Sequence, residues 1–218
     1  MLELKNIIKS FRLPSGEQTN VLNIPSFILQ EKEQLAIYGR SGSGKSTFLN
    51  VVSGILKPDS GSVIVNNTDI TKLDESHRDK FRAQNFGFVF QTFNLLQGFT
   101  ALENVLLGMT FAGKPNKSFA SEMLEYVGLK NKLKNKPAEL SVGEQQRVAI
   151  ARAIVNNPKI ILADEPTANL DAKNSENVIE LIKKVCDEKN ISLVLVSHDK
   201  DVIGRFGRVV EFESLNKN

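Results

Sequence analysis

The run Gly-Arg-Ser-Gly-Ser-Gly-Lys-Ser-Thr at residues 39–47 is the part of this sequence with the clearest chemistry. It fits the pattern G-x-x-x-x-G-K-[ST], in which glycines let the main chain wrap a phosphate with its N–H groups turned inward. Lys45 would add a positive charge at the β- and γ-phosphates, and the Ser46 hydroxyl would ligate Mg²⁺. The run therefore predicts a nucleoside triphosphate site. Its residues are Gly39, Arg40, Ser41, Gly42, Ser43, Gly44, Lys45, Ser46 and Thr47.

The segments beside this run are those that such a site needs. Residues 35–38 are apolar and predict a short buried strand, and residues 46–52 predict a helix with apolar residues at positions 48, 49 and 52. The phosphates would then lie at a helix N-terminus, where the helix dipole favours anions.

A second chemical feature is an apolar strand, predicted at 159–163, that leads into Asp164 and Glu165. Carboxylates at the end of a strand near a phosphate-binding loop are placed to handle Mg²⁺ and an attacking water. Asp164 is predicted in the metal shell, and Glu165 is predicted to act as general base or to polarise the water. Without the 39–47 run, a surface Asp-Glu pair before a turn would explain these residues equally well.

Residues 140–147, Leu-Ser-Val-Gly-Glu-Gln-Gln-Arg, predict the start of another helix. Ser141 and Glu144 have the spacing of a capping box, which is sufficient to explain both in structural terms. A capped helix N-terminus with a glycine at position 143 can also approach an anion closely. The two interpretations are compatible.

Composition limits the class of protein. The chain has 218 residues, 41% of them hydrophobic, which is enough for one large α/β domain or two small ones. A net charge of +3 without dense basic blocks argues against nucleic-acid binding. A lone cysteine, Cys186, suits a reducing cytoplasm. No apolar stretch approaches the ~20 residues that span a bilayer, so any link to a membrane is expected through a partner chain.

The remaining patterns predict two kinds of sheet. Strands at 2–5, 21–29 and 62–65, with turns at 15–17 and 66–67, predict a small antiparallel sheet near the N-terminus. Strands at 159–163, 191–197 and 208–212 alternate with an amphipathic helix around 178–185, which is typical of a parallel α/β sheet. Residues from about 92 to 157 are predicted to be mostly helical, with breaks at Pro115 and Pro137.

Taken together, the 39–47 run, the 140–147 segment, the 160–165 segment and His198 resemble the nucleotide-binding subunit of ATP-binding-cassette (ABC) transporters. The resemblance covers essentially the whole chain, in the family's order and spacing. The 140–147 segment is similar to the family's signature, Leu-Ser-Gly-Gly-Gln, but Val142 replaces the first glycine and Glu144 replaces the glutamine. Ser141 and Gly143, which would face the γ-phosphate, are retained.

The resemblance implies roles for residues elsewhere in the chain. Gln91 would reach Mg²⁺ and the water, and Asn169, Leu170 and Asp171 would touch the opposing site, although Asp171 could simply cap a helix at 172–186. His198 would contact the γ-phosphate, whereas a lone histidine at a strand end is more often structural. Phe11 would stack on adenine, or it could be a core residue at the end of a strand.

The implied fold is α/β: a P-loop NTPase (ABC ATPase) core with an N-terminal antiparallel β subdomain and an inserted α-helical subdomain. The core and β subdomain are expected at about 1–91 and 158–218, and the helical subdomain at about 92–157. The helical subdomain has more apolar residues than a solvated insertion needs. Core packing explains most of them, and some could line a groove for a permease helix. These residues include Phe93, Leu95, Leu96, Phe99, Leu102, Val105 and Leu106.

The implied function is ATP hydrolysis with ATP and Mg²⁺ by a head-to-tail homodimer that drives a separate transmembrane permease at the cytoplasmic face of the inner or plasma membrane. Residues 90–96 and 169–171 look most like the branch of lipoprotein-release, macrolide-export and cell-division ATPases. The alternative is a regulatory ABC ATPase that signals to a cell-envelope or division complex and moves no solute. A soluble DNA-repair or ribosome-associated ABC protein fits less well, and a nucleotide kinase leaves residues 140–147 unexplained.

Overall fold

The structure is a computed structural model that describes residues 1–14 and 16–218. Backbone contacts divide the chain into two compact units. Unit 1 contains residues 1–82 and 195–218, and unit 2 contains residues 83–194. Ser15, part of the turn predicted at 15–17, lies outside the described residues.

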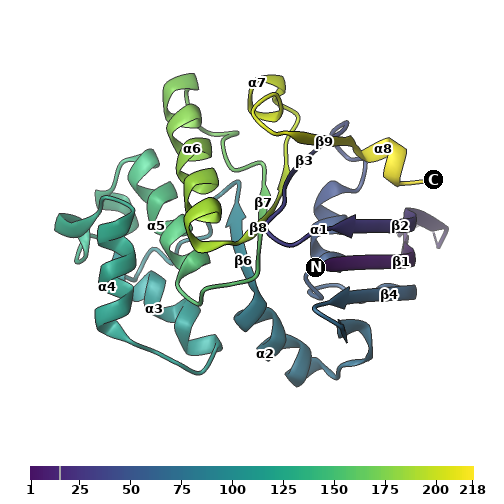
Figure 1. Ribbon diagram of the computed structural model, residues 1–218, viewed down its shortest axis with the longest axis horizontal. Helices are drawn as coiled ribbons and strands as arrows, with labels where there is room; N and C mark the ends of the chain where they lie inside the picture. Colours follow the sequence, from purple (N-terminus) through teal and green to yellow (C-terminus); the bar gives the residue numbers. More distant parts are fainter. Residues whose placement is uncertain (15) are drawn as a thin grey trace. The chain divides into compact units, whose positions relative to one another are not determined.

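An antiparallel sheet begins unit 1 (Figure 1), as predicted. Its strands lie in the order β2 (Gln18–Leu29), β1 (Leu2–Arg12), β4 (Ser60–Val65) and β5 (Thr68–Asp69). Leu2 is paired with Leu29 on one side and Val65 on the other, and all three side chains are fully buried. Strand β1 extends well past the predicted 2–5. The predicted turn at 66–67 is confirmed, because both asparagines have positive φ.

The second part of unit 1 surrounds helix α1 (Lys45–Val52). Strand β3 (Gln34–Tyr38) precedes it and pairs in parallel with β9 (Arg208–Glu211). The ring of Phe48 packs edge-on against Phe27 and Phe212, with centroid distances of 5.2 and 5.9 Å. Two short helices, α7 (Lys200–Ile203) and α8 (Phe212–Leu215), complete this region. Three aromatic rings thus hold α1 between β2 and α8.

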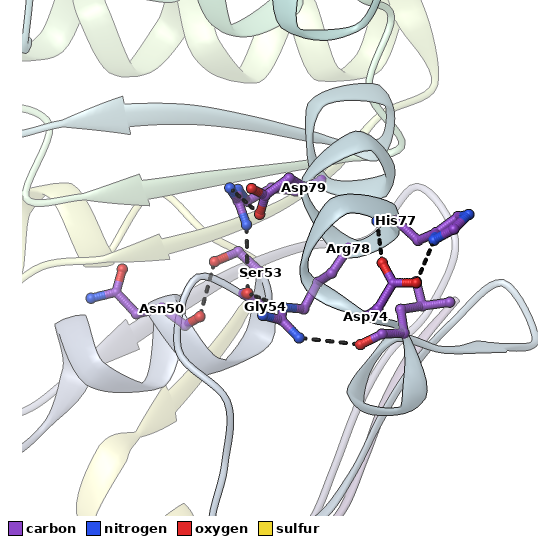
Figure 2. A network of polar contacts seen from close by, with 9 residues as sticks. Asn50, Ser53, Gly54, Asp74, His77, Arg78 and Asp79 are labelled. Atoms are coloured by element: carbon purple, nitrogen blue, oxygen red, sulfur yellow. Dashed lines mark hydrogen bonds and ion pairs between the residues drawn. The ribbon is translucent and has the colours of Figure 1, made fainter.

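A polar network holds the far end of α1 (Figure 2). Arg78, on α2 (Glu75–Asn85), donates from Nε to Gly54 O at 3.0 Å and from Nη1 to Leu73 O at 3.2 Å. Asp74 accepts hydrogen bonds from the backbone and ring of His77 at 2.9 and 2.7 Å, which fixes the start of α2. Helix α2 was not predicted because it has no buried residue, and therefore no apolar periodicity.

Unit 2 contains parallel strands and one long amphipathic helix. Strands β6 (Phe86–Phe90) and β7 (Ile160–Asp164) pair in parallel, and β8 (Ser192–Val196) follows β7 in the sheet order. Residues 192–194 of β8 belong to this unit. Helix α6 (Ala172–Lys189) buries Val178, Ile182 and Val185, as its apolar spacing predicted.

The remaining helices of unit 2 lie between residues 101 and 154 (Figure 1). They are α3 (Ala101–Phe111), α4 (Lys117–Tyr126), the 3₁₀ turns η2 (Lys130–Lys132) and η3 (Pro137–Glu139), and α5 (Val142–Ile154). Residues 92–100 form turns and not a helix. A third 3₁₀ turn, η1 (Ile70–Lys72), lies in unit 1. Among the described residues, no helix combines the length and the apolar character that crossing a bilayer requires. The subdomain boundaries at about 92 and 157 stay a prediction.

Strand β6 and helix α5 approach each other most closely at Gly87. A Cβ on Gly87 would lie 2.3 Å from the backbone oxygen of Ala153 and 3.2 Å from Pro158 Cγ. No side chain fits between this strand and this helix, so β6 and α5 are in direct backbone contact.

We predict that Gly87→Ala lowers the free energy of unfolding by about 1–3 kcal/mol, because the new methyl group can enter only by shifting backbone. Gly98→Ala is the matched control: its Cβ would meet nothing within 4 Å. Urea denaturation of both variants measures the difference. Equal stabilities would show that the strand and helix separate at little cost.

Candidate functional site

The loop at residues 39–44 in unit 1 has the shape of an anion site. Gly42 and Gly44 have φ of 77° and 104°, in the left-handed region that side chains disfavour. Gly44 is the N-cap of α1 and supplies no side-chain cap, so the first-turn N–H groups of α1 have no capping side chain. Ser43 Oγ is buried and has no hydrogen-bond partner within the described residues. Free donors that converge at a helix N-terminus fit a phosphate.

Lys45 supplies the charge of this site. Its side chain is buried, and Nζ donates hydrogen bonds to Gly39 O at 2.8 Å and Arg40 O at 2.6 Å. A buried ammonium is stable only when its donors are satisfied. The two carbonyls hold the ammonium beside the loop, and its third N–H donor remains for an anion.

Two elements that are distant in sequence hold the loop from both sides. A Cβ on Gly44 would lie 3.1 Å from Val21 O on β2, and a Cβ on Gly39 would lie 2.8 Å from Glu213 Oε2 on α8. Glu213 Oε1 also accepts a hydrogen bond from Arg40 N at 3.1 Å, which lowers the pKa of this carboxyl below its ordinary value. Sequence reasoning missed Glu213 because it lies 173 residues from Arg40.

Asn216, one turn after Glu213, fastens α8 to β2. Its Nδ2 donates to Val21 O at 2.9 Å, and its Oδ1 accepts from Asn23 N at 2.6 Å. Lys217 N also donates to Asn23 O. Val21 on β2 thus lies against Gly44 of the loop and also accepts the hydrogen bond from Asn216 after α8.

Phe11 and His198 also belong to unit 1. Phe11, near the end of β1, is 41% exposed, so the alternative that it is a core residue is wrong. Lys9 Nζ lies 5.6 Å from its ring centroid. Ser197 N donates to Ile37 O at 3.0 Å, which places the exposed His198 just past a strand end beside β3. Because β3 leads into the phosphate loop, His198 follows a strand that ends at the same edge.

The acidic residues lie at the carboxyl edge of the unit 2 strands. Phe90 pairs with Asp164, so Gln91 and Glu165 directly follow paired positions on β6 and β7. Glu165 has φ of 46°, a left-handed conformation that costs a non-glycine residue on the order of 1 kcal/mol. The polypeptide therefore turns sharply at the predicted base, and Ala168 N bonds to Glu165 O at 3.2 Å.

The loop at residues 169–171 connects this edge to α6. Asn169 Nδ2 donates to Gln91 O at 3.0 Å, and Asp171 caps α6 by accepting from Asn174 N at 2.9 Å. The helix-cap interpretation of Asp171 is confirmed, and the contact with an opposing site stays a prediction. Leu170 N closes the turn on Thr167 O.

The N-terminus of α5 forms the predicted capping box. Glu144 Oε2 accepts from Ser141 N at 2.8 Å, and Glu144 N donates to Ser141 Oγ at 3.3 Å. Val142 is 47% exposed, and a Cβ on Gly143 would meet nothing closer than Asn174 Oδ1 at 3.7 Å. The turn is thus fixed by its own side chains and open on its outer face.

Glu144 makes one further contact. Lys132 Nζ, on η2, lies 3.2 Å from Glu144 Oε1. The pKa of Glu144 is lowered, first by the hydrogen bond from Ser141 N–H and further by Lys132, so the carboxylate stays ionised well below neutral pH. No local pattern in the sequence indicated Lys132.

Gln146, also on α5, ties this helix to the acidic edge. Its side chain is fully buried, and Nε2 donates to Pro166 O at 3.0 Å, one residue after Glu165. Gln146 Oε1 is buried without a partner within the described residues. This hydrogen bond joins α5 directly to the residue after Glu165.

The donors expected for a metal are a hydroxyl from Ser46, an amide oxygen from Gln91 and a carboxylate from Asp164. These are oxygen donors, which Mg²⁺ prefers, and a single carboxylate matches the few protein ligands that Mg²⁺ takes when phosphates supply the others. Ser46 belongs to unit 1 and the other two to unit 2. Their convergence on one ion is therefore a proposal.

Comparisons with known proteins give consistent results. The protein family described as "ABC transporter" matches residues 22–168. The chain is 43% identical over 208 residues to the ABC transporter ATP-binding protein YtrE of Bacillus subtilis (strain 168), covering 93% of this chain and 90% of that protein. Two structures of MJ0796, described as a bacterial ABC transporter cassette, match with a TM-score of 0.87 and 40% identity over 97% of this chain and 94% of theirs. Both are described as dimeric, one of them as a post-hydrolysis state bound to ADP and Pi.

The hydrogen bond between Arg40 N and Glu213 on α8 leads to a prediction about ATP affinity. Glu213→Gln keeps an acceptor for Arg40 N–H and removes a negative charge near the triphosphate, so it should bind ATP at least as tightly as the wild type. Glu213→Ala removes the acceptor as well and should bind about fivefold more weakly than Glu213→Gln, the worth of a hydrogen bond of ~1 kcal/mol. Titration with a fluorescent ATP analogue measures both. An alanine variant that matches the glutamine variant would show that the loop keeps its shape without α8.

Proposed function

The chain belongs to the ABC transporter ATPase family, and from this membership we propose that two copies close around two molecules of MgATP and drive a separate membrane permease. The family membership makes it an ATPase that uses ATP and Mg²⁺. The proposal concerns which residues perform each step, how the two copies share the sites and what the ATPase drives.

Binding is proposed to rest on unit 1. The N–H groups of the loop and of the first turn of α1 would surround the phosphates, and Lys45 would offset their charge from its position on the loop carbonyls. The ring of Phe11, 41% exposed near the end of β1, is proposed to stack on the base. His198 contacts the γ-phosphate from the edge beside β3.

Hydrolysis is proposed to rest on the acidic edge of unit 2. Glu165 accepts the proton of the attacking water, and Gln91 orients that water through its side-chain amide. The left-handed backbone of Glu165 makes a turn directly after β7, and Gln146 bonds to the next residue, Pro166. When bound by Ser46, Gln91 and Asp164, Mg²⁺ offsets the charge of the phosphate oxygens.

The observation that carries the shared site is the open, self-capped first turn of α5. Its cap bonds are satisfied within the turn, and the space outside Gly143 admits a ligand's approach. The Ser141 hydroxyl accepts from Glu144 N, which leaves its proton free to donate to a phosphate of the second copy. The dimeric MJ0796 structures support this arrangement.

We predict that Glu165→Gln binds ATP but hydrolyses it about 10²–10⁴-fold more slowly, the usual worth of a general base. Because Lys45 and the loop N–H groups hold the nucleotide, the variant should accumulate as an ATP-bound dimer. Size-exclusion chromatography in MgATP, compared with MgADP, tests for that dimer. Turnover close to the wild-type rate would exclude Glu165 as the base, and an inactive monomer in MgATP would exclude the shared site.

A loop of unit 2 is proposed to dock the permease. Asn104 is fully buried and organises residues 96–100: Oδ1 accepts from Leu96 N, and Nδ2 donates to Leu96 O, Phe99 O and Thr100 O. The same loop leaves Leu96 and Phe99 42% and 43% exposed. A fixed loop that presents two apolar side chains suits an apolar helix of a partner.

We predict that Phe99→Ala separates the ATPase from its permease. The isolated variant should keep the wild-type ATPase rate, because Phe99 lies outside the proposed nucleotide contacts, while the amount of membrane partner that co-purifies from native membranes falls several-fold. Ile28→Ala, at a similarly exposed residue of β2, is the matched control. Full recovery of the partner with Phe99→Ala would move the docking surface elsewhere.

Residues 90–96 and 169–171 support assignment to the lipoprotein-release, macrolide-export and cell-division branch. A regulatory role without transport is the second candidate, because the same branch contains cell-division ATPases. Identification of the co-purified membrane protein separates the two: a permease with a transport pathway supports export, and a signalling or cell-wall membrane protein supports regulation.

A further inference from the structure

The first turn of α5, residues 141–144, is called the signature turn here, and it carries the negative charge of Glu144. Glu144 places a carboxylate in this turn, where its Oε2 accepts a hydrogen bond from Ser141 N at 2.8 Å. Ser141 and Gly143 are the residues proposed to face a partner's γ-phosphate. A carboxylate within the same helical turn would repel that phosphate and oppose closure of the dimer.

Lys132 is placed to offset the negative charge of Glu144. Its Nζ lies 3.2 Å from Glu144 Oε1, and the Glu144 side chain is 24% exposed. The other carboxylate oxygen of Glu144 is the one that caps the helix, so capping and ion pairing use different atoms. The contact leaves the capping box intact and brings the net charge of the turn close to zero.

The backbone around Lys132 is fixed by neighbouring hydrogen bonds. Lys132 N donates to Leu129 O at 3.0 Å, and Asn135 N donates to Lys132 O at 3.0 Å. The next residues are joined to α3, where Ala101 N donates to Asn135 O and Leu102 N to Leu133 O. The ammonium therefore comes from an ordered segment, which reduces the entropy lost in forming the ion pair.

Resting on the shared site proposed above, we propose that Lys132 is a positioning residue of the signature turn. Its ammonium offsets the charge of Glu144 and keeps the carboxylate on Ser141 N–H, so that a turn that contains an acid can still face a γ-phosphate. A half-exposed ion pair adds little to folding stability, so its effect is expected in ATP-dependent dimerisation.

The test uses the Glu165→Gln protein as parent and measures its dimer dissociation constant in MgATP by sedimentation. Lys132→Met should raise this constant on the order of tenfold, because an uncompensated carboxylate then faces a phosphate at both sites of the dimer. Adding Glu144→Gln to Lys132→Met removes the uncompensated charge and should bring the constant to within about twofold of the parent. High salt should reduce the Lys132→Met defect, because it screens the repulsion.

Lys130→Met is the matched control. Lys130 lies on the same turn and pairs with Glu125 at 2.5 Å, away from the capping box, so its loss should leave the dimer constant unchanged. A Lys132→Met protein that dimerises like the parent would overturn the inference. A defect that Glu144→Gln fails to rescue and that salt leaves unchanged would reveal a merely structural role and also overturn it.

Gly143→Asp in the same parent separates this inference from the function on which it rests. The open space at Gly143 lets the variant fold, and an acid at the proposed contact should abolish the dimer. If Gly143→Asp abolishes the dimer and Lys132→Met has no effect, the shared site stands and only the role of Lys132 is wrong. If Gly143→Asp dimerises normally, the shared site itself is wrong, and the inference falls with it.

Discussion

A triphosphate can be held by backbone only where several N–H groups converge, and that convergence needs the left-handed conformation of Gly42 and Gly44. A glycine-rich loop has so many accessible backbone conformations that other parts of the protein must restrain it. The rest of unit 1 supplies the restraint: β2 contacts the loop at Gly44, α8 contacts it at Gly39, and Lys45 bonds to its carbonyls. Arg78 fixes the opposite end of α1. The small antiparallel sheet and the last helix are thereby parts of the phosphate site.

In unit 2, a few contacts likewise hold the acidic edge in place. The backbone turns at Glu165, and one buried amide from Gln146 holds the residue that follows. The amide comes from the helix whose first turn carries Ser141 and Gly143. Each chain therefore connects, through a single hydrogen bond, the residue proposed to activate water in one site and the residues proposed to contact phosphate in the other.

Local patterns predicted most of the elements and much of the site. The phosphate loop, the capping box at Ser141 and the cap at Asp171 are each encoded within a few neighbouring residues, so sequence reasoning found them. Glu213, Lys132 and Gln146 act on segments that are remote in sequence, and a side chain that bonds to a distant backbone atom leaves no periodic signal. Helix α2 was missed for another reason: none of its residues is fully buried, so it has no apolar face to detect. Whether the P-loop and the acidic edge converge on one Mg²⁺ stays a prediction.

The contact of Gly87 with Ala153 O has a mechanical consequence for α5. With Gln146 bonded to Pro166, the helix is anchored at two points seven residues apart, a span of roughly 10 Å. The segment from Ser141 to Gln145 extends only about 7 Å beyond the second of these points, Gln146. Because this segment is short, bending the helix by about 5° at Gln146 would move Ser141 by roughly 0.6 Å. A shift of that size is too small to break a hydrogen bond. The first turn of α5 is therefore expected to move together with β6 and the turn after Glu165.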